Sequence, residues 1–112
     1  MRKTYLLDHF TLDMAKSFTY VITVNKINDR FMCFQITSDI SLVNAIRRKR
    51  VTELINILCD TDFKPVIRRV RFKPGDVGIV VNTRTKLPGD LNMEKVYRLI
   101  ESNKVSFYEV IM

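Results

Sequence analysis

Glycine and histidine are scarce in this 112-residue sequence, and their scarcity excludes several kinds of active site. The three glycines form neither a G-x-G-x-x-G pattern nor a P-loop, so a phosphate site must be built from helix ends and cationic side chains. His9 is the single histidine, which leaves a Ser-His-Asp relay no other base and excludes an H-E-x-x-H zinc site.

Cysteine is also sparse. Cys33 and Cys59 each lie in an apolar context without the short spacing of a metal site, so we expect two buried free thiols, no metal and no cofactor. No stretch resembles a signal peptide, and no apolar run approaches the ~20 residues that cross a bilayer. We therefore expect a soluble intracellular protein with no membrane partner.

Positive charge, by contrast, is plentiful. The chain has 19 Lys and Arg against 12 Asp and Glu, a formal net charge of +7 and a pI of 9.7. This charge favours a polyanionic partner, either nucleic acid or a charged nucleotide, ahead of a membrane surface. A hydrophobic content of 46% over this length predicts one domain, residues 1–112, with a single two-layer core.

Runs of β-branched and aromatic residues predict the sheet. Strands are expected over residues 3–7, 20–27, 66–72, 77–84 and 105–112. Pro74 followed by Gly75 suits a type II turn, which predicts that the third and fourth of these strands form a β-hairpin.

The first strand of that hairpin alternates basic and apolar side chains. Arg69, Arg71 and Lys73 would share one face as a basic stripe, opposite Val70 and Phe72 on the core face. An ordinary solvated sheet face is the alternative interpretation of the stripe.

Two short helices are expected in the middle of the chain. Apolar residues at helical spacing run from Val51 to Leu58, and a shorter stripe runs from Leu42 to Ile46. At about 100° per residue the two stripes do not share a face, so we place a break at 47–50.

Other segments have weaker patterns. Residues 8–18 predict a loop with one helical turn, and residues 31–36 either extend the sheet or form a packed loop. A third helix is expected from its cap Asn92 to a stop at Asn103. Together these elements predict an α+β fold, a single two-layer domain with a mixed sheet of about five strands flanked by helices.

Four consecutive cations occupy the expected break: Arg47, Arg48, Lys49 and Arg50. Cations are mildly unfavourable at a helix N-terminus, where the macrodipole is positive, and a bound anion would relieve the conflict. The break is therefore a candidate phosphate site, with a solvated basic turn as the alternative.

The stretch NAIRRKRVTELINILCDT, residues 44–61, resembles the central motif of the small viral ring nucleases, which are type III anti-CRISPR proteins found chiefly in viruses of thermophilic archaea. The likeness covers Ala45-Ile46 and, without a gap, the pattern Leu-Ile-Asn-x-Leu-Cys-x-Thr over residues 54–61. TYLLDHFTLDM near the N-terminus and ESNKVSFYEV near the C-terminus are similar to the same family.

The resemblance implies a homodimer around a mixed sheet, whose two copies form a cleft for cyclic tetraadenylate, the second messenger of type III CRISPR defence. In that family cleavage is metal-independent: a ribose 2′-hydroxyl attacks the adjacent phosphate and a motif histidine protonates the leaving oxygen. A protein of this kind would act in the cytoplasm of the infected host cell.

Carried over to this chain, the motif histidine falls on Arg48, and arginine is not a general acid near neutral pH. Thr11 matches a ligand-binding serine, Lys86 keeps a cation of a later loop, and Asp8 replaces an asparagine where a carboxylate would sit poorly beside an anion. His9 lies in the matched ligand loop, either as a substitute acid or as a packing or surface residue.

The leading hypothesis is a viral anti-defence protein that binds a cyclic oligoadenylate and cleaves it weakly or not at all. Arg48 and His9 are the candidates for catalysis. The candidate ligand-binding residues are Thr11, Arg47, Arg48, Lys49, Arg50 and Lys86. The alternatives are a nucleic-acid-binding protein that uses the basic patch, and an inhibitor that binds a host effector protein.

Overall fold

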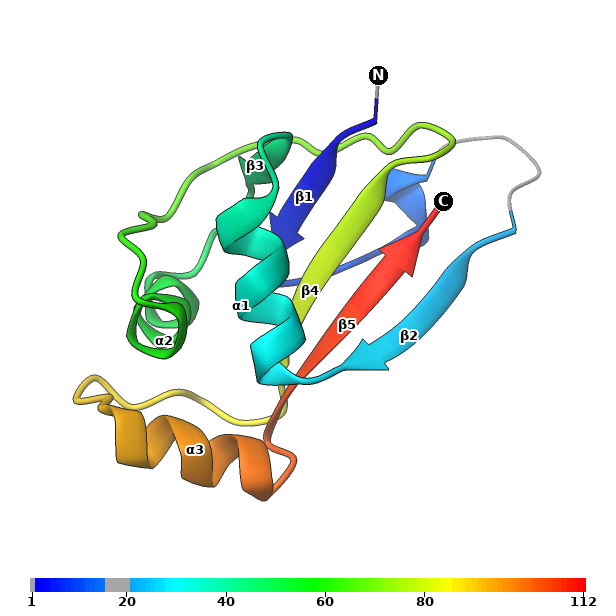
Figure 1. Ribbon diagram of the computed structural model, residues 1–112. Helices are drawn as coiled ribbons and strands as arrows, with labels where there is room; N and C mark the ends of the chain where they lie inside the picture. Colours follow the sequence, from blue (N-terminus) through cyan, green and yellow to red (C-terminus); the bar gives the residue numbers. More distant parts are fainter. Residues whose placement is uncertain (1, 16–20) are drawn as a thin grey trace.

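Five strands form one mixed sheet in the computed structural model, which describes residues 2–15 and 21–112 (Figure 1). The strands are β1 (Thr4–Leu7), β2 (Thr23–Ile27), β3 (Leu42–Asn44), β4 (Val77–Thr83) and β5 (Val105–Ile111). Across the sheet their order is β2-β5-β4-β1-β3. β1 runs parallel to both of its neighbours, and β5 antiparallel to both of its own. The predicted α+β class with a mixed sheet is confirmed.

Helices lie on one face of this sheet. They are α1 (Asp29–Ser38), α2 (Lys49–Cys59) and α3 (Met93–Glu101), and the short 3-10 helix η1 (Leu12–Met14) lies on the other face (Figure 1). Successive side chains of each strand point to opposite faces of the sheet, so they form two apolar clusters, one on each face. Leu6, Ile79 and Phe107 point toward the helices, while Leu7 and Val80 point toward η1.

Several predicted elements are confirmed at their expected places. β1 and β5 match the predicted first and last strands, and η1 supplies the single helical turn expected after β1. α3 begins after Asn92, whose side chain accepts a hydrogen bond from the Lys95 backbone, and it ends before Asn103, which has a left-handed φ of 58°. β2 is shorter than predicted, and Tyr20, where it was expected to begin, lies outside the described residues.

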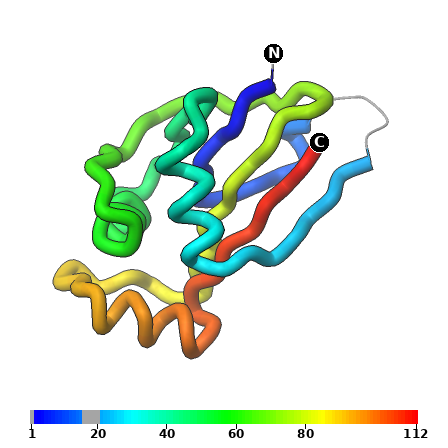
Figure 2. Tube along the Cα trace, viewed as in Figure 1, coloured from blue at the N-terminus to red at the C-terminus, as the bar shows by residue number. Residues whose placement is uncertain are grey.

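The predicted hairpin over 66–84 is wrong. β4 is present, and the turn before it has the expected form: the Asp76 backbone donates to the Lys73 carbonyl at 3.0 Å, and Gly75 has φ +89°. Residues 66–72 are not a strand, because β1 and β5 already occupy both edges of β4. The segment instead passes from the β3 side across one end of the sheet before it turns into β4 (Figure 2).

The predicted alternation of buried apolar and exposed basic side chains in residues 66–72 is nevertheless present, although the segment is not a strand. Val70 and Phe72 are buried against the η1 face of the sheet, where the Phe72 ring packs edge-on against Tyr5 and the Phe72 backbone donates to the Met14 carbonyl at 2.7 Å. Arg69 and Arg71, between and beside them, are exposed. The basic stripe therefore belongs to an extended loop.

Residues 31–36 form neither a strand nor a loop, and both predictions for them are wrong. They lie inside α1, whose start is capped by Asn28: its side-chain oxygen accepts a hydrogen bond from the Phe31 backbone at 2.7 Å. Met32 and Ile36, four residues apart, are the buried face of the helix. The apolar run concealed this spacing because Phe31 and Phe34, on other faces, are exposed.

The helix predicted between Leu42 and Ile46 is also wrong. Residues Leu42–Asn44 form β3, which pairs in parallel with the open edge of β1, with Leu42 opposite Thr4. A free strand edge satisfies backbone groups that an isolated short helix leaves unpaired. The expected break is confirmed, since α2 begins at Lys49.

Cys33 and Cys59 are not free thiols, contrary to the prediction. They form a disulfide between α1 and the C-terminal end of α2, with Cα atoms 5.1 Å apart. The sequence interpretation treated each cysteine alone, whereas the two helices pack side by side on one face of the sheet. The bond ties together the two helices that cover the middle of the core.

Asn56 organises the chain where α2 ends. Its side-chain oxygen accepts hydrogen bonds from the Thr61 hydroxyl and the Phe63 backbone, each at 2.8 Å, and its amide donates to the Phe63 carbonyl. Asp60 supplies the left-handed residue after the helix, with φ 54°. The pattern over 54–61 therefore supplies core, cap and disulfide residues.

Candidate anion-binding site

The site is centred on Asp8, at the end of β1, whose side chain is only 2% exposed. One carboxylate oxygen accepts hydrogen bonds from the Arg47 and Arg48 backbones at 3.0 and 2.9 Å and from Arg48 Nε at 3.4 Å. The other oxygen lies 2.8 Å from His9 Nδ1. The anion expected beside the cations before α2 is thus supplied partly by the chain itself.

The charge of Asp8 is fixed by these contacts. Burial acts to raise the pKa of the Asp8 carboxyl, but the hydrogen bonds from His9 and from the Arg48 and Arg47 backbones outweigh it and hold the pKa below its usual range. Asp8 is therefore ionised at neutral pH. Sequence reasoning missed this role, because nothing in the sequence brings the end of β1 to the start of α2.

We expect Asp8 to make the protein sensitive to acid. A carboxyl whose pKa is lower in the folded state stabilises the fold at pH values above its unfolded pKa of about 3.9, and this contribution is lost as the pH falls through the folded pKa. Urea titrations at several pH values would show a shallower loss of stability below pH ~4 for Asp8→Asn than for the wild type. Asp62→Asn, in an exposed loop, is the matched control, and equal slopes for the wild type and Asp8→Asn would contradict the assignment.

Arg48, the position that matches the motif histidine, has a side chain that is fixed in place by hydrogen bonds. Its guanidinium donates to the Asp8 carbonyl at 3.0 Å and to the Thr83 hydroxyl at 3.2 Å, and its side chain is 54% exposed. These bonds tie the ends of β1 and β4 together and leave part of the guanidinium open to solvent.

A cleft of about 530 Å³, here called the arginine cleft, lies between η1 and the extended loop before β4. It is lined by the predicted residues His9, Thr11 and Arg47, together with Arg69 and Arg71 of the basic stripe. Arg47 is braced toward this loop by a hydrogen bond from its guanidinium to the Arg68 carbonyl at 3.4 Å. Asp13 also lines the cleft and brings a carboxylate to it.

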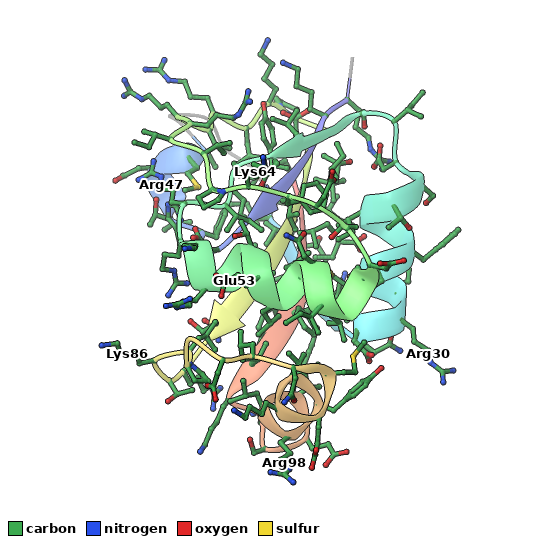
Figure 3. The ribbon with its side chains drawn as sticks, turned by 90° about the vertical axis from the view of Figure 1, so that its left-hand side faces the viewer. Arg30, Arg47, Glu53, Lys64, Lys86 and Arg98 are labelled. Carbon is green, nitrogen blue, oxygen red and sulfur yellow. A yellow bond between two sulfur atoms is a disulfide. The ribbon has the colours of Figure 1, made fainter. Side chains whose placement is uncertain are left out.

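The remaining predicted residues lie in a second cleft, of about 330 Å³. Arg48, Lys49 and Arg50 line it with Lys86 from the loop after β4. Arg50 is paired with Glu53 at 3.0 Å, which offsets part of its charge. Figure 3 shows Arg47 and Lys86 on one side of the molecule and Arg30 on the other. The residues predicted from the sequence to bind a ligand are therefore divided between two clefts on the same side of the molecule.

A third hollow, the sheet groove, opens on the η1 face of the sheet beside the arginine cleft. Its volume is about 410 Å³, and His9 lines both hollows. The walls combine apolar side chains such as Val24 and Val80 with the polar Asn82 and Tyr108. Its composition suits a flat apolar ring with polar edges.

Metal ligands and membrane-spanning helices are not found in the part of the chain that the structure describes. Among these residues, no group of three or more His, Cys, Asp or Glu side chains is placed to hold a metal ion. No helix within 2–15 and 21–112 has the length and apolar character needed to cross a membrane.

The comparisons place the chain among small α+β proteins of archaeal viruses. The chain is 35% identical over 107 residues to the uncharacterized protein ORF116 of Acidianus filamentous virus 1, covering 94% of this chain and 91% of that protein. It belongs to the family of ORF116. No family model matches the sequence.

A solved structure shares the fold. B116 of Sulfolobus turreted icosahedral virus superposes with a TM-score of 0.93 at 28% sequence identity, covering 98% of this chain and 99% of that one. These comparisons establish an archaeal virus protein with this fold. The ring-nuclease likeness and the predicted ligand remain hypotheses beyond that finding.

Proposed function

We propose that this protein binds a phosphate-rich ligand in the arginine cleft, with a cyclic oligoadenylate such as cyclic tetraadenylate as the leading candidate. The observation that carries the proposal is the convergence of Arg47, Arg69 and Arg71 on one cleft, with the Thr11 hydroxyl beside them. One guanidinium group can donate two parallel hydrogen bonds to two oxygens of a phosphate, and a hydroxyl adds a further donor. Because Asp8 already occupies the start of α2, the ligand is bound mainly by side chains.

The neighbouring sheet groove supports a nucleotide rather than an inorganic anion. The two hollows, of about 530 and 410 Å³, lie within the usual range of ligand pockets and share His9 as a common wall. In the proposed arrangement phosphates lie against the arginines and a base enters the groove.

We further propose that the protein acts as a homodimer. Val24, on the same face of the sheet as the groove, is 56% exposed, and the neighbouring Tyr108 is half-buried. A second copy covering this apolar face would place two arginine clefts around one ring-shaped ligand. Sequestration of that ligand in the host cytoplasm would blunt a defence signal even with weak or no cleavage.

Fluorescence anisotropy with labelled cyclic tetraadenylate tests the proposal, with sedimentation velocity on the same samples to determine the oligomeric state. We expect saturable binding by a dimer, and weaker binding of linear tetraadenylate. Absence of binding to every cyclic oligoadenylate, at low as well as physiological salt, would refute the proposed ligand.

Nucleic acid is the second candidate, and the extended loop before β4 favours it. Arg68, Arg69, Arg71 and Lys73 are exposed there within six residues, and Ile67 beside them is fully exposed. A chain of phosphates can follow such a segment. Binding that tolerates any sequence and weakens steeply with salt, by about 0.7 to 0.9 in log–log slope for each phosphate neutralised, would favour this candidate.

A further inference from the structure

We propose that a pocket at one corner of the molecule binds a small zwitterion of the α-amino acid class with an apolar side chain. The pocket, here called the corner pocket, has a volume of about 450 Å³ and lies where β2 leads into α1 and α3 leads into β5 (Figure 1). It shares no lining residue with the arginine cleft, the sheet groove or the cleft beside Lys86. Its ligand would therefore bind independently of the one proposed for the arginine cleft.

The corner pocket exists because β2 turns away before it has covered the whole of β5. Ile27, the last residue of β2, pairs with Phe107, and the chain then enters α1. Val105 and Ser106, at the start of β5, have β4 on one side and, within the described residues, no strand on the other. Ile27 and Ile100, both half-buried, give the pocket an apolar wall.

Two opposite charges line the corner pocket without pairing with each other. The Lys26 ammonium donates to the Asn103 side-chain oxygen at 3.0 Å, a neutral acceptor, which leaves two N–H groups for a ligand. The Asp29 carboxylate is in the first turn of α1, where the helix dipole favours negative charge even without a cation partner. Neither charge has an ion-pair partner within residues 2–15 and 21–112.

The Ser106 hydroxyl is an independent sign of a missing partner. Ser106 is 3% exposed and belongs to the wall of the corner pocket. Its buried oxygen has no hydrogen-bond partner in the part of the chain that the structure describes. A buried hydroxyl without a partner is unfavourable, and most such groups in folded proteins are satisfied. A carboxylate in the pocket would supply the acceptor.

These groups together match one kind of molecule. Lys26, Ser106 and the N–H₂ group of Asn103 are donors for a carboxylate, and Asp29 is an acceptor for an ammonium group. The apolar wall suits an aliphatic or aromatic side chain, and the volume is within the usual range of small-molecule pockets. A phosphate would meet a single lysine and would be repelled by Asp29.

Nuclear magnetic resonance titrations of isotope-labelled protein with L-leucine and L-phenylalanine test the proposal. We expect saturable shifts of the backbone signals of Ile27, Asn28 and Ser106, with the signals of Thr11 and Arg69 in the arginine cleft unchanged. Isocaproate lacks the ammonium group of leucine, and leucinamide lacks the carboxylate. Each should bind about tenfold more weakly than leucine, because each loses a charge-assisted hydrogen bond.

Two variants assign the charges. Lys26→Gln and Asp29→Asn each remove one charge with little change in shape, and each should weaken leucine binding about tenfold. Lys26→Gln should also no longer distinguish leucine from leucinamide, and Asp29→Asn should no longer distinguish leucine from isocaproate. A general loss of structure would not produce these two separate patterns. Lys64→Gln and Asp62→Asn, exposed in the loop after α2, are the matched controls and should bind leucine like the wild type.

Ser106→Ala separates a binding role from a structural one. Alanine removes the unpaired hydroxyl, so the free energy of unfolding should stay the same or rise, while the affinity for leucine should fall about tenfold or less. Urea unfolding and the same titration measure the two quantities. Lower stability with unchanged affinity would show that the hydroxyl has a structural role.

The remaining outcomes decide the proposal. If neither leucine nor phenylalanine binds, or if the shifted signals lie outside the corner pocket, the proposed site is wrong. If isocaproate or leucinamide binds as tightly as leucine, the ligand is not recognised as a zwitterion. Unchanged leucine affinity in both Lys26→Gln and Asp29→Asn would overturn the assignment of the two charges.

Discussion

A variant with both Cys33 and Cys59 replaced by alanine is expected to unfold with a free energy about 3–4 kcal/mol below that of the oxidised protein. The bond closes a loop with a sequence separation of 26, and the chain-entropy relation assigns about 3.5 kcal/mol to a loop of this size. Urea unfolding followed by circular dichroism measures the difference, which is a large part of the roughly 5–15 kcal/mol typical of a domain.

The reduced wild type is the control for that experiment. Dithiothreitol should lower the urea midpoint of the wild type and leave the midpoint of the alanine variant unchanged, since only the wild type has a bond to reduce. Equal midpoints for oxidised and reduced wild type would show that the bond contributes nothing to stability. Free thiols were the expectation from sequence because each cysteine lies in an apolar context without the short spacing of a metal site.

The second large effect concerns ligand binding. Replacing Arg47, Arg69 and Arg71 together by alanine should weaken binding of cyclic tetraadenylate by at least about a hundredfold, because each charge-assisted hydrogen bond to phosphate contributes about 1.5–3 kcal/mol. The log–log dependence of affinity on salt should also become shallower, by about 0.7 for each phosphate that the protein no longer neutralises. Anisotropy titrations between low and physiological salt measure both quantities.

A control variant with the same net charge distinguishes the effect of the cleft arginines on affinity from the effect of the protein's total charge. Replacing Arg30, Arg98 and Lys104 by alanine removes three positive charges elsewhere and also lowers the formal charge from +7 to +4. This triple variant should bind nearly as well as the wild type. If both triple variants bound equally weakly, the attraction would be diffuse and the cleft would not be the binding site.

The sequence correctly predicted those helices, strands and turns that are determined by residues close to them in the chain. The helical spacing from Val51 onward, the cap at Asn92 and the turn at Gly75 are each decided by their neighbours, and the structure has all three. The strands β1 and β5 were found for the same reason.

Elements decided by distant partners were missed. Residues 66–72 have a strand pattern, but β4 has no free edge for them, and that fact depends on β1, some 60 residues earlier. Leu42–Asn44 became a strand because β1 offered an edge. In both cases tertiary competition for backbone hydrogen bonds overrode local propensity.

The candidate site was predicted in part. The cations at 47–50 and Thr11 were found from the sequence, and the structure places Arg47, Thr11 and His9 at one cleft. That Arg69 and Arg71 join them depends on how the loop before β4 folds back over the sheet. The expectation that Asp8 would repel a ligand missed its bonds to the start of α2.

The order of strands in the sheet has a consequence for how the protein is made. β1 lies between β3 and β4, and the Asp76 side chain, just before β4, accepts a hydrogen bond from the Lys3 backbone at 2.9 Å, across 73 positions in sequence. A growing chain on the ribosome can pair β1 with β3 early, but the centre of the sheet must wait for β4 and β5. Contacts between such distant segments slow folding. Until β4 and β5 have been synthesised, the apolar faces of β1 lack their partners. A ribosome that stalls before β4 would therefore release a chain that is prone to aggregate rather than a smaller folded protein.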